Sequence, residues 1–305
     1  MLALLCGGQG LISADMFNLA AEAPQAQPVF AAAAALLGED PRLLVRGQGN
    51  AEAAGNRTSQ LLSVTAALAL CAALEPALPR GFVVTGYSVG EMAAWSIAGI
   101  WPYATALHLT AQRAAAMDRA SQEPGRLAYV RGLGQEQVAQ LAQAHECQIA
   151  IVSPGALFVV GGPERAIPGF CAQARAAGAA RAEALDVHIA AHTSQLSAAI
   201  PEFEAALRQS GGQKILPGRQ LLAGGNGERI FSPEPALHRL AAQVATPINW
   251  TMTLDSLCER GVSHVLDLGP GNALQRTAAG HLHGVACYGA SNFQSLSGLQ
   301  AWLAA

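Results

Sequence analysis

The stretch that decides the fold is GFVVTGYSVGEM, residues 81–92, in which a Gly-x-Ser-x-Gly element centred on Ser88 follows an apolar, β-type run. A serine placed between the end of a strand and the start of a helix is held on a sharp turn with its hydroxyl exposed. Gly86 and Gly90 carry no Cβ, so the backbone can bend there and neighbouring elements can approach the serine. We therefore predict a strand, a tight turn and a helix, with Ser88 as a candidate nucleophile.

The helix expected at residues 89–98 has free N–H groups in its first turn, and these point back at Ser88. Such groups stabilise negative charge that develops on an oxygen beside a nucleophile. A Gly-x-Ser-x-Gly sequence also arises by chance in glycine-rich chains, and this chain has 32 Gly. A purely structural turn is the alternative interpretation of this element.

Two other segments have the same order of strand, glycine loop and helix. Residues 2–6 run into Gly7–Gly10 before a helical stretch with Met16 and Phe17, and residues 264–268 run into a glycine loop at 269–272. Helical patterns also occupy residues 28–37 and 58–74. Strands that each end in a glycine-rich loop before a helix indicate a parallel α/β sheet with a site at its carboxyl edge.

The middle of the chain has a different order of elements. Patterns typical of strand, helix, strand, strand, helix and strand follow one another at 127–130, 135–145, 148–152, 157–160, 168–177 and 181–187. That order is the split βαβ, or ferredoxin-like, arrangement. We predict an α/β protein with two units, a large domain formed by 1–124 and 189–305 and a small ferredoxin-like domain inserted at 125–188, which suits a length of 305 residues.

The composition restricts the function classes. Hydrophobic residues are 51% of the chain, charged residues 13%, and the net charge is −3, so nothing favours nucleic acid or anionic lipid as a partner. The six cysteines form no Cys-x-x-Cys pair and no metal-ligand spacing, which is typical of reduced core residues. No signal-peptide pattern opens the chain, and the longest mostly apolar run, 64–74, is short for a membrane span. We expect a cytoplasmic protein without a metal.

A nucleophilic serine needs a base, and eight histidines compete for that role. His192 lies where the chain would re-enter the large domain, but a lone histidine is often structural. Arg113 gives a different signal, because it lies between Leu109 and Met117 at spacings of four, on the apolar face of a helix expected at 103–119. An unpaired buried guanidinium costs about 3–5 kcal/mol. Either an internal salt bridge or a substrate carboxylate would meet that need.

Several motifs together resemble the malonyl-CoA:acyl-carrier-protein transacylase family, which includes the acyltransferase domains of polyketide and fatty acid synthases. They occur in family order from residue 6 to about 275: Gly8-Gln9-Gly10, Gln60 in Thr58–Leu62, Gly86–Glu91, Arg113 with Met117, Ala191-His192-Thr193, Pro247–Trp250 and Leu268–Asn272. The resemblance implies an α/β-hydrolase-like large domain with a parallel sheet and an inserted ferredoxin-like small domain.

The same resemblance assigns roles to individual residues. Ser88 would be the nucleophile and His192 its general base, oriented by a backbone carbonyl at the position of Asn249. The backbone N–H groups of Gln9 and Val89 would form the oxyanion hole.

Arg113 would bind the free carboxylate of malonyl, with Gln60 beside it. Malonyl would pass from CoA to Ser88 and then to the thiol on the phosphopantetheine-type arm of an acyl carrier protein, with no bound cofactor.

The chain departs from the family pattern at several positions. Tyr87 stands where His is usual, and Gly7 stands where Pro is usual, which predicts a looser opening loop. Ala191 leaves space for a branched malonyl, so the choice between malonyl and methylmalonyl stays open. The family's Asn near Ser153 is absent.

The length and the divergent opening are most similar to the epsilon subunit of malonate decarboxylase, which charges a carrier subunit whose arm is a phosphoribosyl-dephospho-CoA group. A stand-alone transacylase for fatty acid or trans-acting polyketide synthesis is the alternative within the family.

Two other classes share parts of this pattern. A serine hydrolase or thioesterase would use Ser88, but it would place an acid between the serine and a late histidine. Here Asp186 lies too close to His192 and Asp267 follows it. A hydrolase of neutral esters also has no use for Arg113. A catalytically inactive docking module is the third class, and the presence of Ser88, Arg113 and His192 argues against it.

Overall fold

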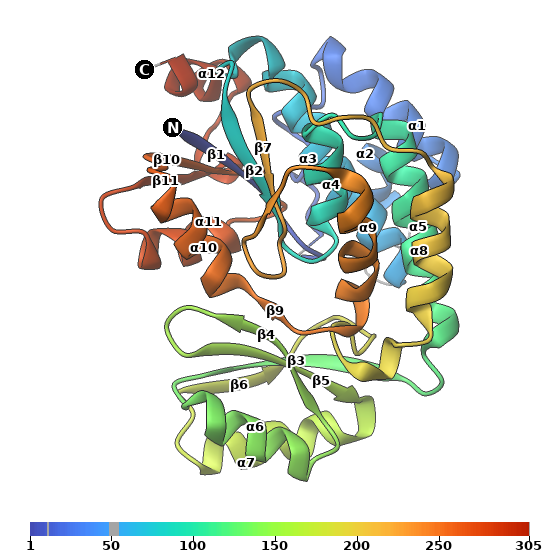
Figure 1. Ribbon diagram of the computed structural model, residues 1–305, viewed down its shortest axis with the longest axis vertical. Coiled ribbons are helices and arrows are strands. Elements are labelled where there is room, and N and C mark those ends of the chain that lie inside the picture. The colour runs from blue at the N-terminus through green and yellow to red at the C-terminus, as the bar shows by residue number, and fades with distance from the viewer. Residues whose placement is uncertain (11, 49–54, 305) are drawn as a thin grey trace.

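Two β-sheets organise the protein in the computed structural model, which describes residues 1–10, 12–48 and 55–304 (Figure 1). The first sheet has six strands in the order β11-β10-β1-β2-β7-β8, parallel from β11 to β7, with β8 as an antiparallel edge. Its strands are β1 Leu2–Cys6, β2 Phe82–Gly86, β7 Arg219–Leu222, β8 Arg229–Ile230, β10 His264–Asp267 and β11 Ala286–Gly289.

The three strands predicted to end in glycine loops are neighbours in this sheet. β10, β1 and β2 run parallel and adjacent, so their carboxyl ends meet at one edge, as predicted. The loops are hydrogen-bonded to each other there: the Gly7 N–H donates to the Gly269 carbonyl at 3.0 Å and the Tyr87 N–H to the Cys6 carbonyl at 2.9 Å. The site edge is therefore built by three loops from distant parts of the sequence.

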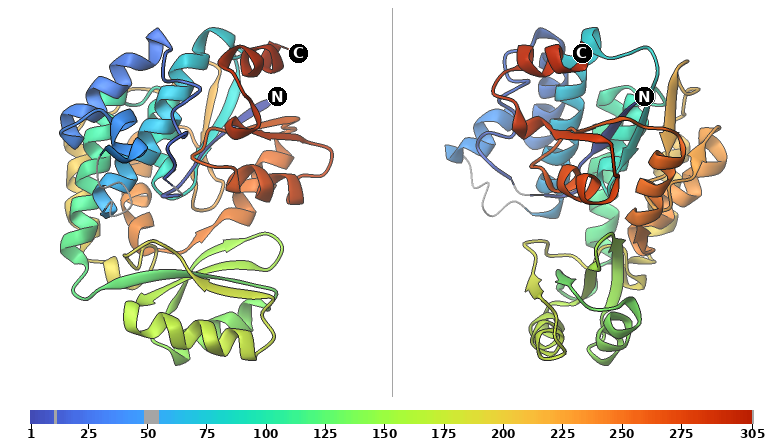
Figure 2. Two further views of the ribbon diagram at one scale, coloured as in Figure 1. Left: turned by 180° about the vertical axis from the view of Figure 1, so that it is seen from behind. Right: turned by 90° about the vertical axis from the view of Figure 1, so that its left-hand side faces the viewer.

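Helices cover the first sheet (Figures 1 and 2). The described helices of this part of the chain are α1 Gln27–Leu37, α2 Pro41–Leu43, α3 Asn56–Leu74, α4 Gly90–Ile97, α5 Tyr103–Ala120, α8 Ala199–Gln209, α9 Pro233–Ala242, α10 Trp250–Glu259, α11 Ala273–His281 and α12 Leu296–Ala304. The segment predicted to be helical around Met16 and Phe17 instead forms successive turns with i to i+3 hydrogen bonds. The side-chain amide of Asn18 donates to Asp15 at 2.9 Å, and such local bonds compete with a regular helix.

α3 is the central helix of this layer and packs against α1, α4 and α5. With its continuation to Ala77 it is long and apolar enough to cross a membrane by length and composition, which corrects the expectation that the apolar run is too short. The interspersed Ser and Thr residues do not interrupt its apolar character. Because 72% of the most apolar 18-residue stretch of this helix is buried inside the protein, α3 has the environment of a core helix.

The second sheet confirms the predicted order β-α-β-β-α-β. Its strands β3 Gly125–Arg131, β4 Gln148–Ser153, β5 Leu157–Pro163 and β6 Arg181–Ala184 alternate with α6 Gln135–Ala144 and α7 Ile167–Ala176. They lie in the antiparallel order β6-β3-β5-β4, and β9 Ile248–Asn249 from the later chain adds a parallel edge beside β4. Figure 2 shows α6 and α7 on the side of this sheet that faces away from the first.

The α/β fold with a ferredoxin-like segment is therefore confirmed. This segment has its own hydrophobic cluster, which includes Val130, Val160 and Phe170. The division at 125–188 stays a prediction, and the contribution of β9 shows that the second sheet also draws on residues outside that range.

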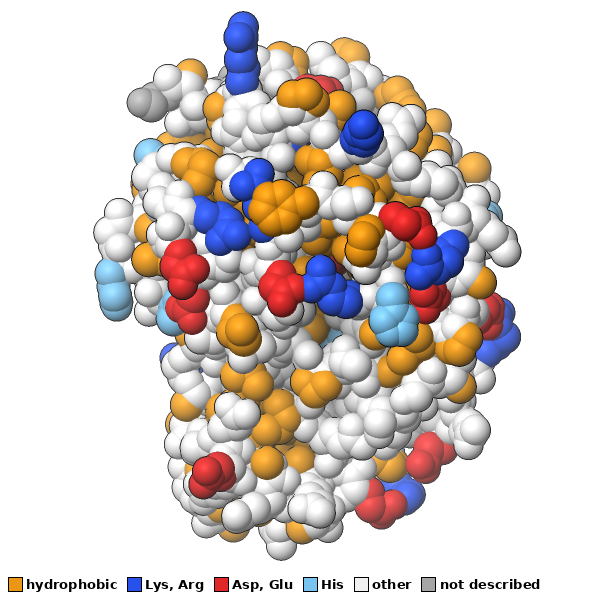
Figure 3. All heavy atoms as spheres, viewed as in Figure 1, with side chains coloured by type: hydrophobic (Ala, Val, Ile, Leu, Met, Phe, Trp, Pro, Cys, Tyr) orange, Lys and Arg blue, Asp and Glu red, His pale blue; other side chains and the backbone are white. Residues whose placement is uncertain are grey.

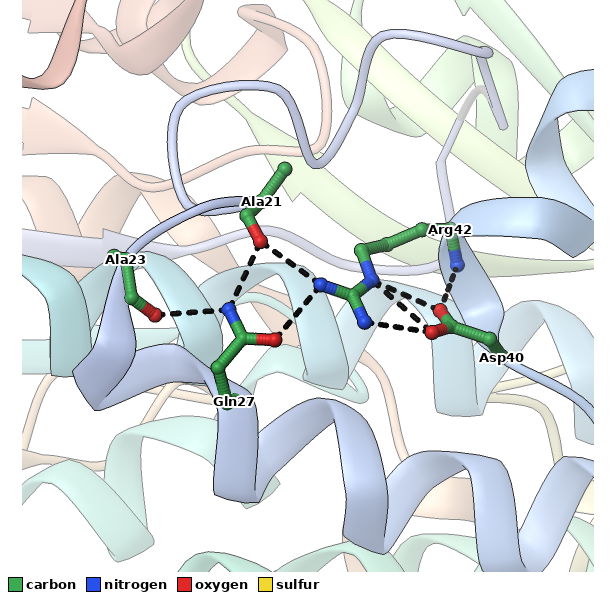
Figure 4. A network of polar contacts seen from close by, with 5 residues as sticks. All are labelled: Ala21, Ala23, Gln27, Asp40 and Arg42. Carbon is green, nitrogen blue, oxygen red and sulfur yellow. Dashed lines mark hydrogen bonds and ion pairs between the residues drawn. The ribbon is translucent and has the colours of Figure 1, made fainter.

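A polar network ties the start of α1 to α2 (Figure 4). The guanidinium of Arg42 pairs with Asp40 at 2.6 Å and donates to the Ala21 carbonyl at 2.8 Å and to Gln27 Oε1 at 2.9 Å. It also lies over the ring of Phe30, 4.5 Å from the centroid. One arginine thus satisfies acceptors from three separate segments of the helical layer.

Candidate active site

Ser88 lies on a strained turn between β2 and α4. Its φ is 56°, a left-handed value that costs free energy for a residue with a side chain and is typical of functional turns. A Cβ on the neighbouring Gly90 would lie 2.2 Å from the Cys6 carbonyl, so only glycine permits this contact with β1. The predicted strand, turn and helix are therefore present, and they present the serine at the carboxyl edge of the sheet.

The hydroxyl of Ser88 faces His192. The distance from Ser88 Oγ to His192 Nε2 is 2.7 Å, and the histidine is 1% exposed. Its Nδ1 lies 2.6 Å from the backbone carbonyl of Gln243, which can only accept, so Nδ1 carries the proton and Nε2 is free to accept from the serine. This is the geometry of a serine activated by a neutral imidazole base.

The residue that orients His192 corrects a prediction. The family pattern assigned this role to the carbonyl of Asn249, but His192 Nδ1 bonds to Gln243. Asn249 is committed elsewhere, because its backbone belongs to β9 beside β4 and its side chain accepts from the Met252 N–H as the N-cap of α10. Gln243 lies at the start of a one-turn 3-10 helix after α9, where its carbonyl accepts only a long bond, 3.4 Å, from the Thr246 N–H and can also accept from His192.

The two groups expected to form the oxyanion hole lie in adjoining loops. Val89 follows the nucleophile at the start of α4, and Gln9 lies in the loop after β1. Within residues 1–10, 12–48 and 55–304, the backbone N–H groups of Gln9 and Val89 donate to no other backbone group. Free N–H groups in this position suit the charge that develops on a substrate oxygen.

The loop after β1 is tighter than the presence of Gly7 predicted. A Cβ on Gly7 would lie 2.3 Å from the Gly269 carbonyl, and the Gly7 N–H donates to that same oxygen. A proline at this position would have no N–H to donate. The chain therefore fixes its opening loop through Gly7 rather than loosening it.

Arg113 is buried on α5 and points to Gln60 on α3. The arginine is 2% exposed, and its Nη1 donates to Gln60 Oε1 at 2.6 Å. Gln60 is held in turn by Asn56 at 2.7 Å. In the described part of the chain Arg113 forms no ion pair within 4.0 Å, and its Nη2 is buried without a hydrogen-bond partner. The internal salt bridge that the sequence left open is therefore not formed among these residues.

The charges around the site act on one another. Burial lowers the pKa of Arg113 to about 10, while Glu91 favours its charged form. Burial lowers the pKa of His192 to about 3, with the positive charge of Arg113 adding to the effect and the Gln243 carbonyl opposing it. His192 is therefore neutral at physiological pH, which is the state that a general base requires.

Sequence reasoning did not identify Gln243 or Glu91. Gln243 was hidden because a backbone carbonyl can come from any residue type. Glu91 had a visible signal, since it is the only charged residue in the apolar helix GEMAAWSI. Buried acids are rare in such helices unless they have partners.

The acids that a Ser-His-Asp triad would need are occupied elsewhere. Asp186 is exposed and pairs with His188 at 2.9 Å. Asp267 is buried and accepts from the backbone N–H groups of Gly269 and Gln275, both at 2.9 Å. Neither carboxylate contacts His192.

On the face drawn in Figure 3, basic and acidic side chains are intermixed rather than gathered by sign.

A serine on a strand-to-helix turn, beside a neutral histidine, defines an α/β protein built for acyl transfer or hydrolysis. The comparisons narrow this class. The malonyl CoA-acyl carrier protein transacylase of Salmonella typhimurium is 30% identical over 285 residues, which cover 88% of each chain. The structure of the MCAT of Mycobacterium tuberculosis is 27% identical, covers 100% of both chains and gives a TM-score of 0.89.

A further structure is that of a type II PKS acyl-carrier protein in complex with its malonyl-transacylase. It matches 98% of this chain and 99% of that chain, with a TM-score of 0.89 and 23% identity. At this level of identity the match shows the fold alone. No protein-family model matches the chain. The chain belongs to the malonyl CoA-acyl carrier protein transacylase family, whose members are acyltransferases.

Proposed function

We propose that this protein transfers a malonyl group from malonyl-CoA to the thiol of an acyl carrier protein through a malonyl ester on Ser88. The observation that carries the proposal is the combination of a Ser88–His192 pair with a buried arginine whose Nη2 has no partner. A hydrolase of neutral esters has no use for that cation. A malonyl carboxylate would accept a charge-assisted hydrogen bond from this unpaired Nη2, and the planar guanidinium suits such a bond well.

In the first half-reaction, Ser88 Oγ attacks the thioester carbonyl while His192 Nε2 takes the hydroxyl proton. The backbone N–H groups of Gln9 and Val89 stabilise the oxyanion. The carbon–sulfur bond then breaks, His192 returns the proton to the sulfur, and CoA leaves as a thiol.

In the second half-reaction, the carrier thiol gives its proton to His192 and attacks the ester carbonyl. The carbon–oxygen bond breaks and Ser88 recovers its proton. The proton of Ser88 leaves with CoA and the proton of the carrier thiol replaces it, so Ser88 and His192 regain their starting states and the cycle needs no cofactor.

Intact-protein mass spectrometry after brief incubation with malonyl-CoA or acetyl-CoA, followed by peptide mapping, tests this proposal. We expect a malonyl adduct on the Ser88 peptide and none with acetyl-CoA. Steady release of CoA without an adduct would favour a thioesterase. If no adduct forms and no CoA is released, the result would favour a docking module. Methylmalonyl-CoA in the same assay decides whether the space beside Ala191 admits a branched substrate.

For the carrier, we propose the carrier subunit of malonate decarboxylase, with its phosphoribosyl-dephospho-CoA arm, in the cytoplasm. Tyr87 and Gly7, where the family pattern has His and Pro, are the features that favour this specialised partner over a fatty acid or polyketide carrier. Transfer rates from malonyl-Ser88 to both kinds of carrier test this choice. Faster transfer to a phosphopantetheine carrier would instead favour the stand-alone transacylase.

A further inference from the structure

Glu91 is a buried carboxylate that the steps above do not use. It is 3% exposed, and burial raises its pKa to about 7. Its Oε2 accepts from the backbone N–H of Gly224 at 2.9 Å and from the side-chain amide of Gln243, and its Oε1 accepts from Trp95 Nε1 at 3.3 Å. A buried acid with three donors aimed at it is a built feature rather than a chance burial.

Gln243 connects this carboxylate to the candidate base. Its side chain donates to Glu91, and its backbone carbonyl accepts from His192 Nδ1. The connection closes on itself, because the Glu91 backbone N–H donates to the Ser88 carbonyl at 3.0 Å. Ser88, His192, Gln243 and Glu91 therefore form a ring of hydrogen bonds that begins and ends on the nucleophile turn.

We propose that Glu91 is the positioning residue of this site, which holds Gln243 and thereby the carbonyl that orients His192. This inference rests on the proposed roles of Ser88 and His192. Gln243 begins a 3-10 helix of one turn, Gln243–Ala245, outside both sheets. Its carbonyl accepts one long backbone bond, from the Thr246 N–H at 3.4 Å, so the anchored side chain adds the stronger restraint on the direction of this carbonyl. A fixed carbonyl keeps the Nδ1 proton in place and directs Nε2 at Ser88.

A cavity of about 350 Å3 borders this ring. Glu91 and Gln243 form part of its wall, together with apolar side chains such as Ile230 and Leu240 and with the polar side chains of His238 and Arg239. Gln243 Oε1 is buried and has no hydrogen-bond partner among the described residues. Because Glu91 lines this cavity, a small anion has a route to the place of its carboxylate once that side chain is shortened.

The test uses Glu91→Ala, Glu91→Gln, Gln243→Leu and the double variant Glu91→Ala/Gln243→Leu. The readout is the rate at which phenylmethanesulfonyl fluoride labels Ser88, which depends on His192 but on no malonyl group. We expect Glu91→Ala and Gln243→Leu each to slow labelling by about 10- to 100-fold, and the double variant to be no slower than either. Glu91→Gln keeps an acceptor for Gln243, so its loss should be below about tenfold.

Formate separates positioning from a general loss of folding. We expect formate to restore labelling of Glu91→Ala in a saturable manner and to leave Gln243→Leu unchanged. Glu228→Ala removes an exposed acid that pairs with Arg239 at the cavity wall and is the matched control, expected at the wild-type rate. With malonyl-CoA as the substrate, we expect the kcat of Glu91→Ala and of Gln243→Leu to fall with little change in KM.

Multiplicative losses in the double variant, or wild-type labelling by folded Glu91→Ala or folded Gln243→Leu, would overturn the proposal. If the wild type is labelled at Ser88 but does not accept malonyl-CoA, the proposed function fails while the positioning role is still measured.

Discussion

Arg113 and Gln60 form a fixed pair inside the protein, with Arg113 Nη1 donating to Gln60 Oε1 at 2.6 Å. The glutamine uses its other group to donate to Asn56 at 2.7 Å. One side of the guanidinium is thus held by a neutral acceptor, which directs it without neutralising its charge. An arginine kept charged and oriented in this way is prepared for an anion from outside the chain.

Replacing Arg113 by Ala should therefore discriminate between acyl groups. We expect the rate of Ser88 malonylation to fall by about 30-fold or more, because a buried charge pair is worth about 2–5 kcal/mol to binding. Acetyl transfer should be tolerated, since acetyl has no carboxylate. Adduct formation measured by mass spectrometry checks both. Arg119→Ala on the same helix removes an exposed partner of Glu202 and is the control. Equal losses for malonyl and acetyl would exclude a carboxylate-binding role.

The pH dependence of Ser88 labelling reports the state of His192. Because burial and the charge of Arg113 lower the pKa of His192 to about 3, the base is neutral at pH 5. An ordinary imidazole with a pKa near 6.5 would be about 30-fold less available there. We expect the labelling rate of the wild type to change by less than about tenfold from pH 8 to 5, because His192 stays neutral while Glu91, with a pKa of about 7, becomes neutral as in Glu91→Gln. In Arg113→Ala the pKa of His192 is raised, so the acid limb should move to higher pH. A loss of about 30-fold in the wild-type labelling rate at pH 5 would contradict this.

Much of this site could be predicted from the sequence because its parts are local. The glycines around Ser88, the periodicity that buries Arg113 and the β-α-β-β-α-β order are all patterns within short windows. The orienting carbonyl could not be predicted in the same way. The choice of Gln243 over Asn249 depends on how a turn after α9 packs beneath His192, and a backbone carbonyl leaves no signature in residue type. Likewise, the composition of α3 shows that the helix is apolar, but its place in a protein core follows from the three helices that pack against it.

Glu91→Gln should stabilise the protein at high pH. The pKa of Glu91 is raised to about 7 by burial, so the folded state binds a proton that the unfolded state has lost. The stability from this group is present below about pH 4.5 and is lost as the pH rises through 7. At pH 8 the glutamine variant should gain up to about 3 kcal/mol, with little gain at pH 4.5. Urea unfolding at both values measures this. A gain of equal size at the two pH values would show that the ionisation of Glu91 is not its cause.

Arg42→Lys should weaken the helical layer away from the site. A lysine cannot reproduce the paired contacts with Asp40 together with those to Ala21 and Gln27, so we expect a loss of about 1–2 kcal/mol. Arg46→Lys is the control, because within the part of the chain that the structure describes Arg46 forms one long hydrogen bond, 3.4 Å, to Asn18. Thermal unfolding compares the two. A similar melting temperature for Arg42→Lys and the control would mean that the network contributes little.

Tyr87→Phe tests the residue that stands where the family pattern has His. Burial raises the pKa of Tyr87, and the side chain of Ser153, at the end of β4, interacts with the Tyr87 hydroxyl and opposes this rise. Its ring packs edge-on against Trp250, with centroids 5.2 Å apart and an interplanar angle of 83°. Phenylalanine keeps the ring contact and loses the bond to the second sheet, so we expect a loss of about 1 kcal/mol.

Ser153→Ala should cost a similar amount, and the two changes together should cost little more than one, because both remove the same side-chain interaction. Urea unfolding of the four proteins in this cycle measures the coupling. Ser88 labelling should stay close to the wild-type rate in Tyr87→Phe, since the hydroxyl is directed at Ser153 and not at the nucleophile. Additive losses would show that Tyr87 and Ser153 act independently, and that the tyrosine does not link the nucleophile turn to the second sheet.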